Sequence, residues 1–281
     1  MAEAVDPLDT RQIEPDAAQY NASLVGRSDE TDSLGYFTVR HDGDPVPFEP
    51  GQYMTIGVVA DGRMVQRPYS VASSPRVAGD GYELYVRLVQ GGLFTPLLWR
   101  LPIGHRMRII GPKGKFTLLP DDDRIHVFIS SGTGNAPFVS MIRTLIIDGT
   151  PRRALFLNGV SYQDELGYRK VVEGWQHDGT YPVTYVPTVS RLSDPRNAGW
   201  TGRTGRVEAI VEAVCRDFDL TPHNAIAYLC GNPDMILNAD ATFQGLGFAE
   251  ESVRKELYWP KGKEPTLAAA EGVDPAVNDD E

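Results

Sequence analysis

The hydrophobic pattern of this chain changes in kind at Asp121-Asp122-Asp123. Between Tyr20 and about Pro120, short alternating or apolar runs are separated by Gly, Pro and Asp, which is typical of strands in an antiparallel barrel or sandwich. We therefore expect one helix, Phe94–Arg100, among strands at Ala22–Val25, Gly35–Arg40, Tyr53–Val58, Tyr82–Val89 and Arg106–Ile110.

After residue 123 the runs are typical of a different fold. Ile125–Ser130 is continuously apolar, as expected of a strand buried on both faces. Strand-like and helical stretches then alternate, which predicts a doubly wound parallel α/β sheet. The strands are expected at Ala154–Leu157, Val183–Val189, Ala225–Cys230 and Val253–Tyr258, and the helices at Phe138–Ile147, Gln163–Trp175, Val207–Cys215 and Asp234–Gln244.

This pattern predicts two domains between two loose ends: a flexible arm at 1–19, an antiparallel β-barrel at 20–120, an α/β domain at 121–259 and a flexible acidic extension at 260–281. The ends carry most of the net charge of -11, with -4 in residues 1–20 and -6 in residues 264–281. The nearly neutral body shows no basic stripe, so nucleic-acid binding is disfavoured.

Several other classes of protein are also disfavoured. No apolar run approaches the roughly 18 residues that a membrane-spanning helix needs. Residues 1–12 are polar and acidic, unlike a signal peptide. The two cysteines, Cys215 and Cys230, cannot hold an iron–sulfur cluster by themselves. We expect no metal site and a reducing, cytoplasmic location.

Arg67-Pro68-Tyr69-Ser70 follows a predicted strand and combines a cation, an aromatic ring and a hydroxyl. Arginine offers a permanently charged fork to a pyrophosphate, a tyrosine ring can stack on an isoalloxazine, and a serine hydroxyl can hydrogen-bond flavin N5. Gly91-Gly92 then precede a short helix with Thr95 near its start, an arrangement that can bind phosphate. An ordinary edge strand and a simple capped turn are the alternatives.

Together with Gly51-Gln52-Tyr53 and Tyr85-Val86-Arg87, these residues resemble the flavin domain of the bacterial ferredoxin (flavodoxin)–NADP reductase family. The resemblance covers roughly residues 20–259 and implies non-covalent FAD. By that resemblance Arg67 faces the pyrophosphate, Tyr69 stacks on the isoalloxazine and Ser70 approaches N5. The other FAD-binding residues would be Pro68, Tyr85, Val86, Arg87, Gly92, Leu93, Phe94, Thr95 and Thr133.

Gly132-Thr133-Gly134-Asn135-Ala136-Pro137 follows a predicted strand and opens a predicted helix. Glycines let the backbone approach a pyrophosphate, and a helix N-terminus favours its charge. The segment resembles the family's Gly-Thr-Gly-x-Ala-Pro, although the family usually has an aliphatic residue where Asn135 stands. Gly132, Thr133, Gly134 and Pro137 would thus bind NADP. A tight strand-to-helix turn without a ligand is the alternative.

The preference between NAD and NADP depends on charges near the later strands. Asn158-Gly159 ends the second strand without the acid typical of an NAD site. Ser161 stands where the bacterial subgroup has an arginine that contacts the 2′-phosphate, so we expect a softer preference for NADP. The side chains of Ser190, Arg191, Arg203 and Arg206 supply a hydroxyl and cations suited to a 2′-phosphate. A solvated basic loop is the alternative interpretation.

Cys230-Gly231-Asn232-Pro233 ends another predicted strand, where ligands gather in doubly wound sheets. We interpret Cys230 as a small polarisable side chain beside nicotinamide C4, with Gly231, Asn232 and Pro233 completing the site; a buried hydrophobe is the alternative. Lys255–Trp259 resembles the family's carboxyl end. There Tyr258 or Trp259 would cover the flavin, and Glu256 would exchange a proton with solvent.

The motifs and the resemblance together imply an FAD-dependent reductase in which Ser70, Cys230 and Glu256 are the catalytic residues. Hydride would pass between NADP(H) and FAD, and single electrons between FAD and a separate ferredoxin or flavodoxin. The alternatives are an NADPH-dependent flavin reductase, the reductase component of an oxygenase, or a non-catalytic flavin-binding subunit of a larger complex.

Overall fold

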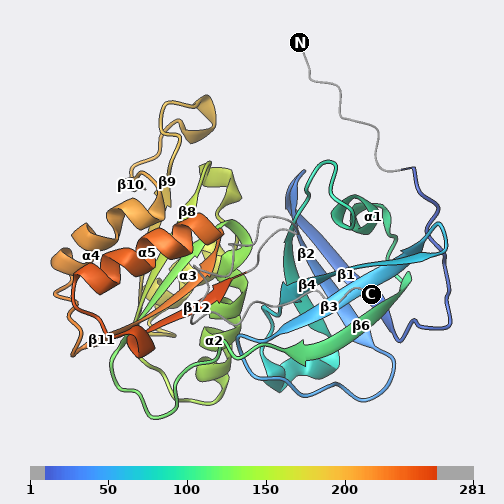
Figure 1. Ribbon diagram of the computed structural model, residues 1–281, viewed down its shortest axis with the longest axis horizontal. Coiled ribbons are helices and arrows are strands. Elements are labelled where there is room, and N and C mark those ends of the chain that lie inside the picture. The colour runs from blue at the N-terminus through green and yellow to red at the C-terminus, as the bar shows by residue number, and fades with distance from the viewer. Residues whose placement is uncertain (1–9, 258–281) are drawn as a thin grey trace, which may run out of the picture. The chain divides into compact units, whose positions relative to one another are not determined.

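The computed structural model describes residues 10–257, which belong to two compact units (Figure 1). The first unit is Met1–Leu118 with Ala136–Ile147, and the second is Leu119–Asn135 with Asp148–Glu281. Within residues 10–257, no helix has both the length and the apolar character that crossing a membrane requires.

The first unit is a six-stranded antiparallel sheet with the order β4-β3-β6-β1-β2-β5. Val71, just after β4, forms an isolated bridge with Leu84 of β5, so the two ends of this order meet. The strands are β1 (Ala22–Thr31), β2 (Leu34–His41), β3 (Tyr53–Ala60), β4 (Arg63–Ser70), β5 (Tyr82–Arg87) and β6 (Arg106–Lys113). The other elements are the 3₁₀ turn η1 (Pro75–Asp80), α1 (Thr95–Arg100) and α2 (Ala136–Ile147).

Alternation along these strands builds the core of the first unit, because every second side chain points inward. Leu24, Phe37, Ile56 and Leu84 are fully buried there. Part of the arm expected at 1–19 is joined to the sheet: Ile13 forms a bridge with Ala60.

The second unit is a six-stranded parallel sheet with the order β10-β9-β8-β7-β11-β12. The strands are β7 (Ile125–Ser131), β8 (Ala154–Val160), β9 (Val183–Val189), β10 (Arg203–Thr204), β11 (Ala225–Gly231) and β12 (Val253–Leu257). The α-helices are α3 (Arg169–Asp178), α4 (Val211–Asp217) and α5 (Pro233–Gly245). The 3₁₀ turns are η2 (Gly132–Asn135), η3 (Gln163–Glu165), η4 (Pro195–Asn197), η5 (Val207–Ile210) and η6 (Glu250–Ser252).

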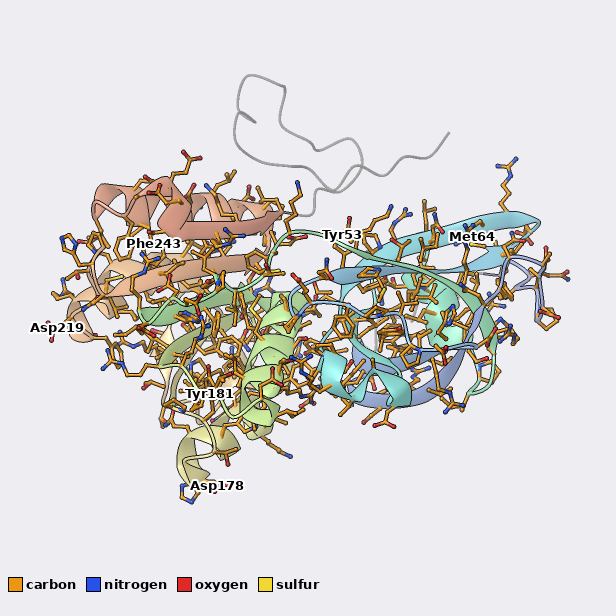
Figure 2. All side chains as sticks on the ribbon, turned by 90° about the horizontal axis from the view of Figure 1, so that it is seen from below. Tyr53, Met64, Asp178, Tyr181, Asp219 and Phe243 are labelled. Carbon is orange, nitrogen blue, oxygen red and sulfur yellow. The ribbon has the colours of Figure 1, made fainter. Side chains whose placement is uncertain are left out.

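The strand order locates the ligand-binding edge of the second unit. The chain runs outward from β7 to β10, then returns to place β11 on the other side of β7. The topological switch point therefore lies between β7 and β11, and ligands of doubly wound sheets bind at the carboxyl ends of the strands there. Phe243 of α5 is labelled in Figure 2. It packs into the core of this unit, and its ring centroid lies 4.9 Å from that of Phe248.

Two local expectations were wrong. Arg67-Pro68-Tyr69-Ser70 forms the end of β4 rather than following a strand; no residue of β4 is buried, so the apolar pattern did not reveal it. Pro68 is tolerated because β4 stands at one end of the strand order of this sheet. The expected helix Gln163–Trp175 is divided, since Tyr168 has φ 62° and interrupts it between η3 and α3. The helix expected from about Phe94 to Arg100 is α1, which begins at Thr95.

Candidate functional site

The glycine turn η2 leaves β7 at the switch point and lies directly against the end of β11. A Cβ on Gly134 would be 2.3 Å from the carbonyl oxygen of Cys230 and 2.6 Å from Cα of Gly231. Gly132 has φ 54°, and a Cβ there would meet no atom within 4 Å. One glycine thus permits close packing and the other leaves an open backbone surface, which fits the approach of a pyrophosphate.

The start of α5 fixes the segment that follows β11. Gly231 has φ 140°, and a Cβ there would be 2.5 Å from Oγ of Ser131. The same oxygen accepts a hydrogen bond from the backbone N–H of Asn232, at 2.8 Å. Oδ1 of Asn232 caps α5 by accepting from the N–H of Asp234, and Pro233 is the first helical residue. Asn232 and Pro233 therefore have a structural role as well as the predicted binding role.

Cys230 is buried at the end of β11, between Ser130 of β7 and Glu256 of β12 in the strand register. Burial raises the pKa of the Cys230 thiol well above its ordinary value, and the Glu256 carboxylate raises the pKa further. The thiol is therefore neutral, which suits a packing role and not a nucleophile.

The candidate 2′-phosphate residues differ in how far their charge is already compensated. Arg203 Nη2 lies 2.6 Å from an Asp217 oxygen, and Arg206 Nη1 lies 3.8 Å from a Glu208 oxygen. Arg191 donates to the hydroxyl of Tyr162, at 2.6 Å, and pairs with no carboxylate among residues 10–257. Ser190 is exposed directly after β9. Arg191 is thus the candidate whose charge is most available to an anion.

On the first unit, strand register separates the flavin motif into two faces. Tyr69 pairs with Met54 and Arg67 with Ile56, whereas Ser70 pairs with Tyr53. Arg67 and Tyr69 therefore share one face of β4, and Pro68 and Ser70 share the other. Arg67 pairs with no carboxylate in the part of the chain that the structure describes, so its charge can serve a pyrophosphate.

Tyr69 is partly buried, and its ring centroid lies 6.0 Å from that of Phe94. Burial raises the pKa of the Tyr69 hydroxyl well above its ordinary range, so the phenol stays neutral. A neutral, partly buried ring fits the predicted stacking on an isoalloxazine.

The other residues predicted to bind FAD fall into different environments. Tyr85 is buried and stacks on Tyr36, with ring centroids 4.9 Å apart, while Val86 and Phe94 have their side chains in the core. Thr95 accepts from the N–H of Val89, at 2.9 Å. Contacts from these residues to FAD would thus use mainly backbone groups. Leu93 is exposed and Arg87 is half-buried; Gly92 donates its N–H to the Val89 carbonyl, and Thr133 lies in η2.

Comparison with known proteins places both units in one family. Residues 28–118 match the oxidoreductase FAD-binding domain, and residues 128–240 match the oxidoreductase NAD-binding domain. Ferredoxin–NADP reductase B of Sorangium cellulosum is 32% identical over 228 residues, which cover 78% of this chain and 88% of that protein. The chain belongs to the ferredoxin–NADP reductase-like family of FAD- and NAD-binding oxidoreductases.

The chain is also similar to a phenol hydroxylase component and to two solved reductases. The phenol hydroxylase P5 protein of Acinetobacter pittii is 31% identical, over 90% of this chain and 67% of that protein. A solved cytochrome P450 reductase from Amycolatopsis has a TM-score of 0.72 at 27% identity, covering 86% of this chain and 70% of that chain. A ferredoxin NADP⁺ reductase from Neisseria gonorrhoeae, with bound FAD and NADP, has a TM-score of 0.73 at 21% identity. The match covers 85% of this chain and 99% of that chain.

Membership of the ferredoxin–NADP reductase-like family confirms the predicted fold: an antiparallel FAD-binding sheet is followed by a parallel α/β NAD-binding domain. The chain is thus a flavoprotein oxidoreductase with binding domains for FAD and NAD(P). Tyr258 and Trp259, predicted to cover the flavin, lie outside the described residues.

Helix α2 supplies contacts that sequence reasoning missed. Ser140 of α2 donates to the carbonyl of Ser73, at 2.7 Å, and Arg143 donates to the carbonyl of Ala72, at 3.0 Å, and to Glu83, at 2.6 Å. These bonds fix the segment that follows Ser70. Polar residues inside a largely apolar helix were the available signal.

Thr144→Val is expected to lower the free energy of unfolding by about 2 kcal/mol. The hydroxyl of Thr144 donates to the carbonyl of Ser140, so the buried Ser74 hydroxyl donates to Thr144, at 2.8 Å. Valine keeps the shape but leaves the Ser74 hydroxyl without its acceptor. Urea unfolding measures the change, and exposed Thr184→Val serves as the control. Equal losses in both variants would contradict this account.

Both cysteines are expected to resist labelling in the native protein at neutral pH. Cys215 is buried, and burial raises the pKa of its thiol to about 11. Cys230 is also buried with a raised thiol pKa, so neither residue forms an accessible thiolate. A chromogenic disulfide reagent should react slowly in buffer and with both thiols in urea. Rapid reaction of Cys230 in the native protein would mean that the end of β11 is open.

Proposed function

We propose that this chain is a ferredoxin–NADP⁺ reductase that exchanges hydride between NADP(H) and FAD and single electrons between FAD and ferredoxin or flavodoxin. The observation that carries the choice is the charge of Arg191 at the carboxyl edge of the sheet, which no carboxylate among residues 10–257 compensates. A 2′-phosphate bound there would distinguish NADP from NAD. The two buried thiols offer no cluster ligands, which supports a separate one-electron carrier.

Most of the residues proposed to hold FAD are on the first unit. Arg67 would neutralise the pyrophosphate, Tyr69 would stack on the isoalloxazine, and Ser70 would hydrogen-bond N5. FAD supplies the chemistry when bound, since it takes two electrons as hydride and releases them singly. The chain supplies positioning, which α2 supports by fixing residues 72–74.

Most of the residues proposed to hold NADP are on the second unit. The open backbone at Gly132 would receive the pyrophosphate, and Ser190, Arg191 and Arg206 would receive the 2′-phosphate. Arg203 is a weaker candidate because Asp217 already compensates its charge. The neutral Cys230 would pack beside the nicotinamide without reacting, and half-buried Glu256 would exchange a proton with solvent.

A second candidate function is the reductase component of an oxygenase. Its support is the 31% identity to the phenol hydroxylase P5 protein over 90% of this chain. The chain spans about two thirds of that relative's length, so the relative has a part that this chain does not match. We propose ferredoxin or flavodoxin as the carrier because 88% of the ferredoxin–NADP reductase B length is covered.

The proposed location is the cytoplasm.

The test is turnover with alternative acceptors. The FAD-loaded protein is given NADPH and either ferredoxin, flavodoxin, free FMN or an oxygenase component, and the initial rates are compared. We expect rapid reduction of ferredoxin or flavodoxin and slow reduction of free FMN. If free FMN alone were reduced, the chain would be a flavin reductase, and if no acceptor were reduced, a flavin-binding subunit.

A further inference from the structure

Tyr162 lies between two arginines in the segment that follows β8. Arg191, just after β9, donates to the Tyr162 hydroxyl at 2.6 Å, and its guanidinium carbon is 5.3 Å from the ring centroid. The guanidinium carbon of Arg196 lies 3.8 Å from the same centroid. Tyr162 therefore uses its ring for one cation and mainly its hydroxyl for the other.

A buried asparagine ties the two segments together. Asn197 Nδ2 donates to the carbonyls of Ser161 and Arg191, both at 2.9 Å, and its Oδ1 accepts from the N–H of Gln163 at 2.7 Å. Asn197 is 2% exposed, so water competes little for these bonds. The backbones on either side of the Tyr162–Arg191 pair are thus fixed before any ligand binds.

The two arginines are not equivalent in charge. Asp164 accepts two hydrogen bonds from Arg196, at 2.7 and 3.1 Å, and so compensates that cation. Arg191 has a neutral hydroxyl as its partner and no carboxylate within residues 10–257. A guanidinium has five N–H donors, and the hydroxyl occupies one of them. Arg191 therefore keeps its full charge and most of its donors for an anion.

We propose that Tyr162 is a positioning residue that sets the preference for NADPH over NADH by holding Arg191 ready for the 2′-phosphate. The inference rests on the proposed function and deepens it. Ser161, directly before Tyr162, carries no charge, so the cation for the phosphate comes from the neighbouring strand end. A pre-positioned side chain binds more tightly because less of its freedom is lost on binding.

The test measures equilibrium binding rather than turnover. The FAD-loaded wild-type protein, Tyr162→Phe, Arg191→Ala and the double variant are titrated calorimetrically with 2′,5′-ADP and with 5′-AMP, which lacks the 2′-phosphate. We expect Arg191→Ala to weaken 2′,5′-ADP binding more than tenfold and Tyr162→Phe to weaken it roughly threefold to tenfold. Binding of 5′-AMP should be unchanged in all variants and serves as the internal control for folding.

The double variant decides whether Tyr162 acts through Arg191. If it does, Tyr162→Phe has no further effect once Arg191 is alanine. An unchanged affinity in Tyr162→Phe alone, or an equal loss in both backgrounds, would overturn the positioning role while leaving the proposed function intact. A wild-type protein that binds both nucleotides equally would instead overturn the proposed NADP specificity itself.

Discussion

Gly134→Ala is expected to lower the free energy of unfolding by about 3 kcal/mol, near the upper end of overpacking costs. The new methyl group would lie 2.3 Å from the Cys230 carbonyl oxygen and 2.6 Å from Gly231 Cα. Both are backbone atoms of a central strand, so no side-chain rotation relieves the clash. The turn η2 must move instead, and a displacement of about 1 Å can slow reduction by NADPH about 100-fold.

Gly174→Ala is the matched control for this prediction. Gly174 lies inside α3, and a Cβ there would meet no atom within 4 Å. Alanine should raise the free energy of unfolding by roughly 0.5–1 kcal/mol, because it restricts the unfolded chain. Urea unfolding and NADPH-dependent flavin reduction are measured for both variants. Wild-type reduction kinetics in Gly134→Ala would show that the turn does not lie on β11 as described.

His126 is expected to make the protein lose about 3 kcal/mol of stability between pH 7 and pH 4. The side chain is fully buried in β7, its ring centroid 5.5 Å from that of Tyr228. Burial lowers the pKa of His126 to about 4 from the ordinary 6.5, and nearby Arg152 lowers the pKa further. As pH falls below 6.5, His126 takes up a proton in the unfolded chain but stays neutral in the folded protein. The stability that is present above pH 6.5 is therefore lost toward pH 4.

The measurement is the free energy of unfolding in urea at pH 7, 5 and 4 for the wild type and for His126→Phe. Phenylalanine cannot titrate, and neither ring nitrogen of His126 has a hydrogen-bond partner of normal geometry among residues 10–257. The difference in stability between variant and wild type should therefore grow by about 3 kcal/mol on acidification. Exposed His177→Gln serves as the control for replacing a histidine. Parallel pH profiles for His126→Phe and the wild type would refute the prediction.

The architecture was predictable because burial leaves a periodic signal. Val183–Val189 is β9 with the same bounds in the sequence and in the structure, since this run is rich in the β-branched and aromatic residues that favour strands. β4 left no such signal because its first residue is exposed and its other seven residues are all half-buried. The glycines of the turn predicted the position of η2. They did not predict that Gly134 lies against the Cys230 carbonyl, since that contact joins residues 96 positions apart.

Which arginines of the candidate site are paired with carboxylates also depends on contacts between residues far apart in the sequence. The sequence ranks Arg191, Arg203 and Arg206 alike, and the structure separates them through Asp217, Glu208 and Tyr162. Nothing local predicts that α2, which follows the nucleotide turn in the chain, hydrogen-bonds the segment after the flavin motif. The family resemblance supplied the residues predicted to bind the cofactors. The hydrogen bonds and ion pairs that those residues make could be found only from the structure.

The most direct test is an anaerobic titration of the FAD-loaded protein with NADPH and, separately, with NADH, followed by visible absorption. The proposal predicts that the purified protein is yellow, that stoichiometric NADPH bleaches the flavin band, and that NADH requires a higher concentration. A protein that stays colourless after incubation with FAD, or a bound flavin that neither nucleotide reduces, would contradict it.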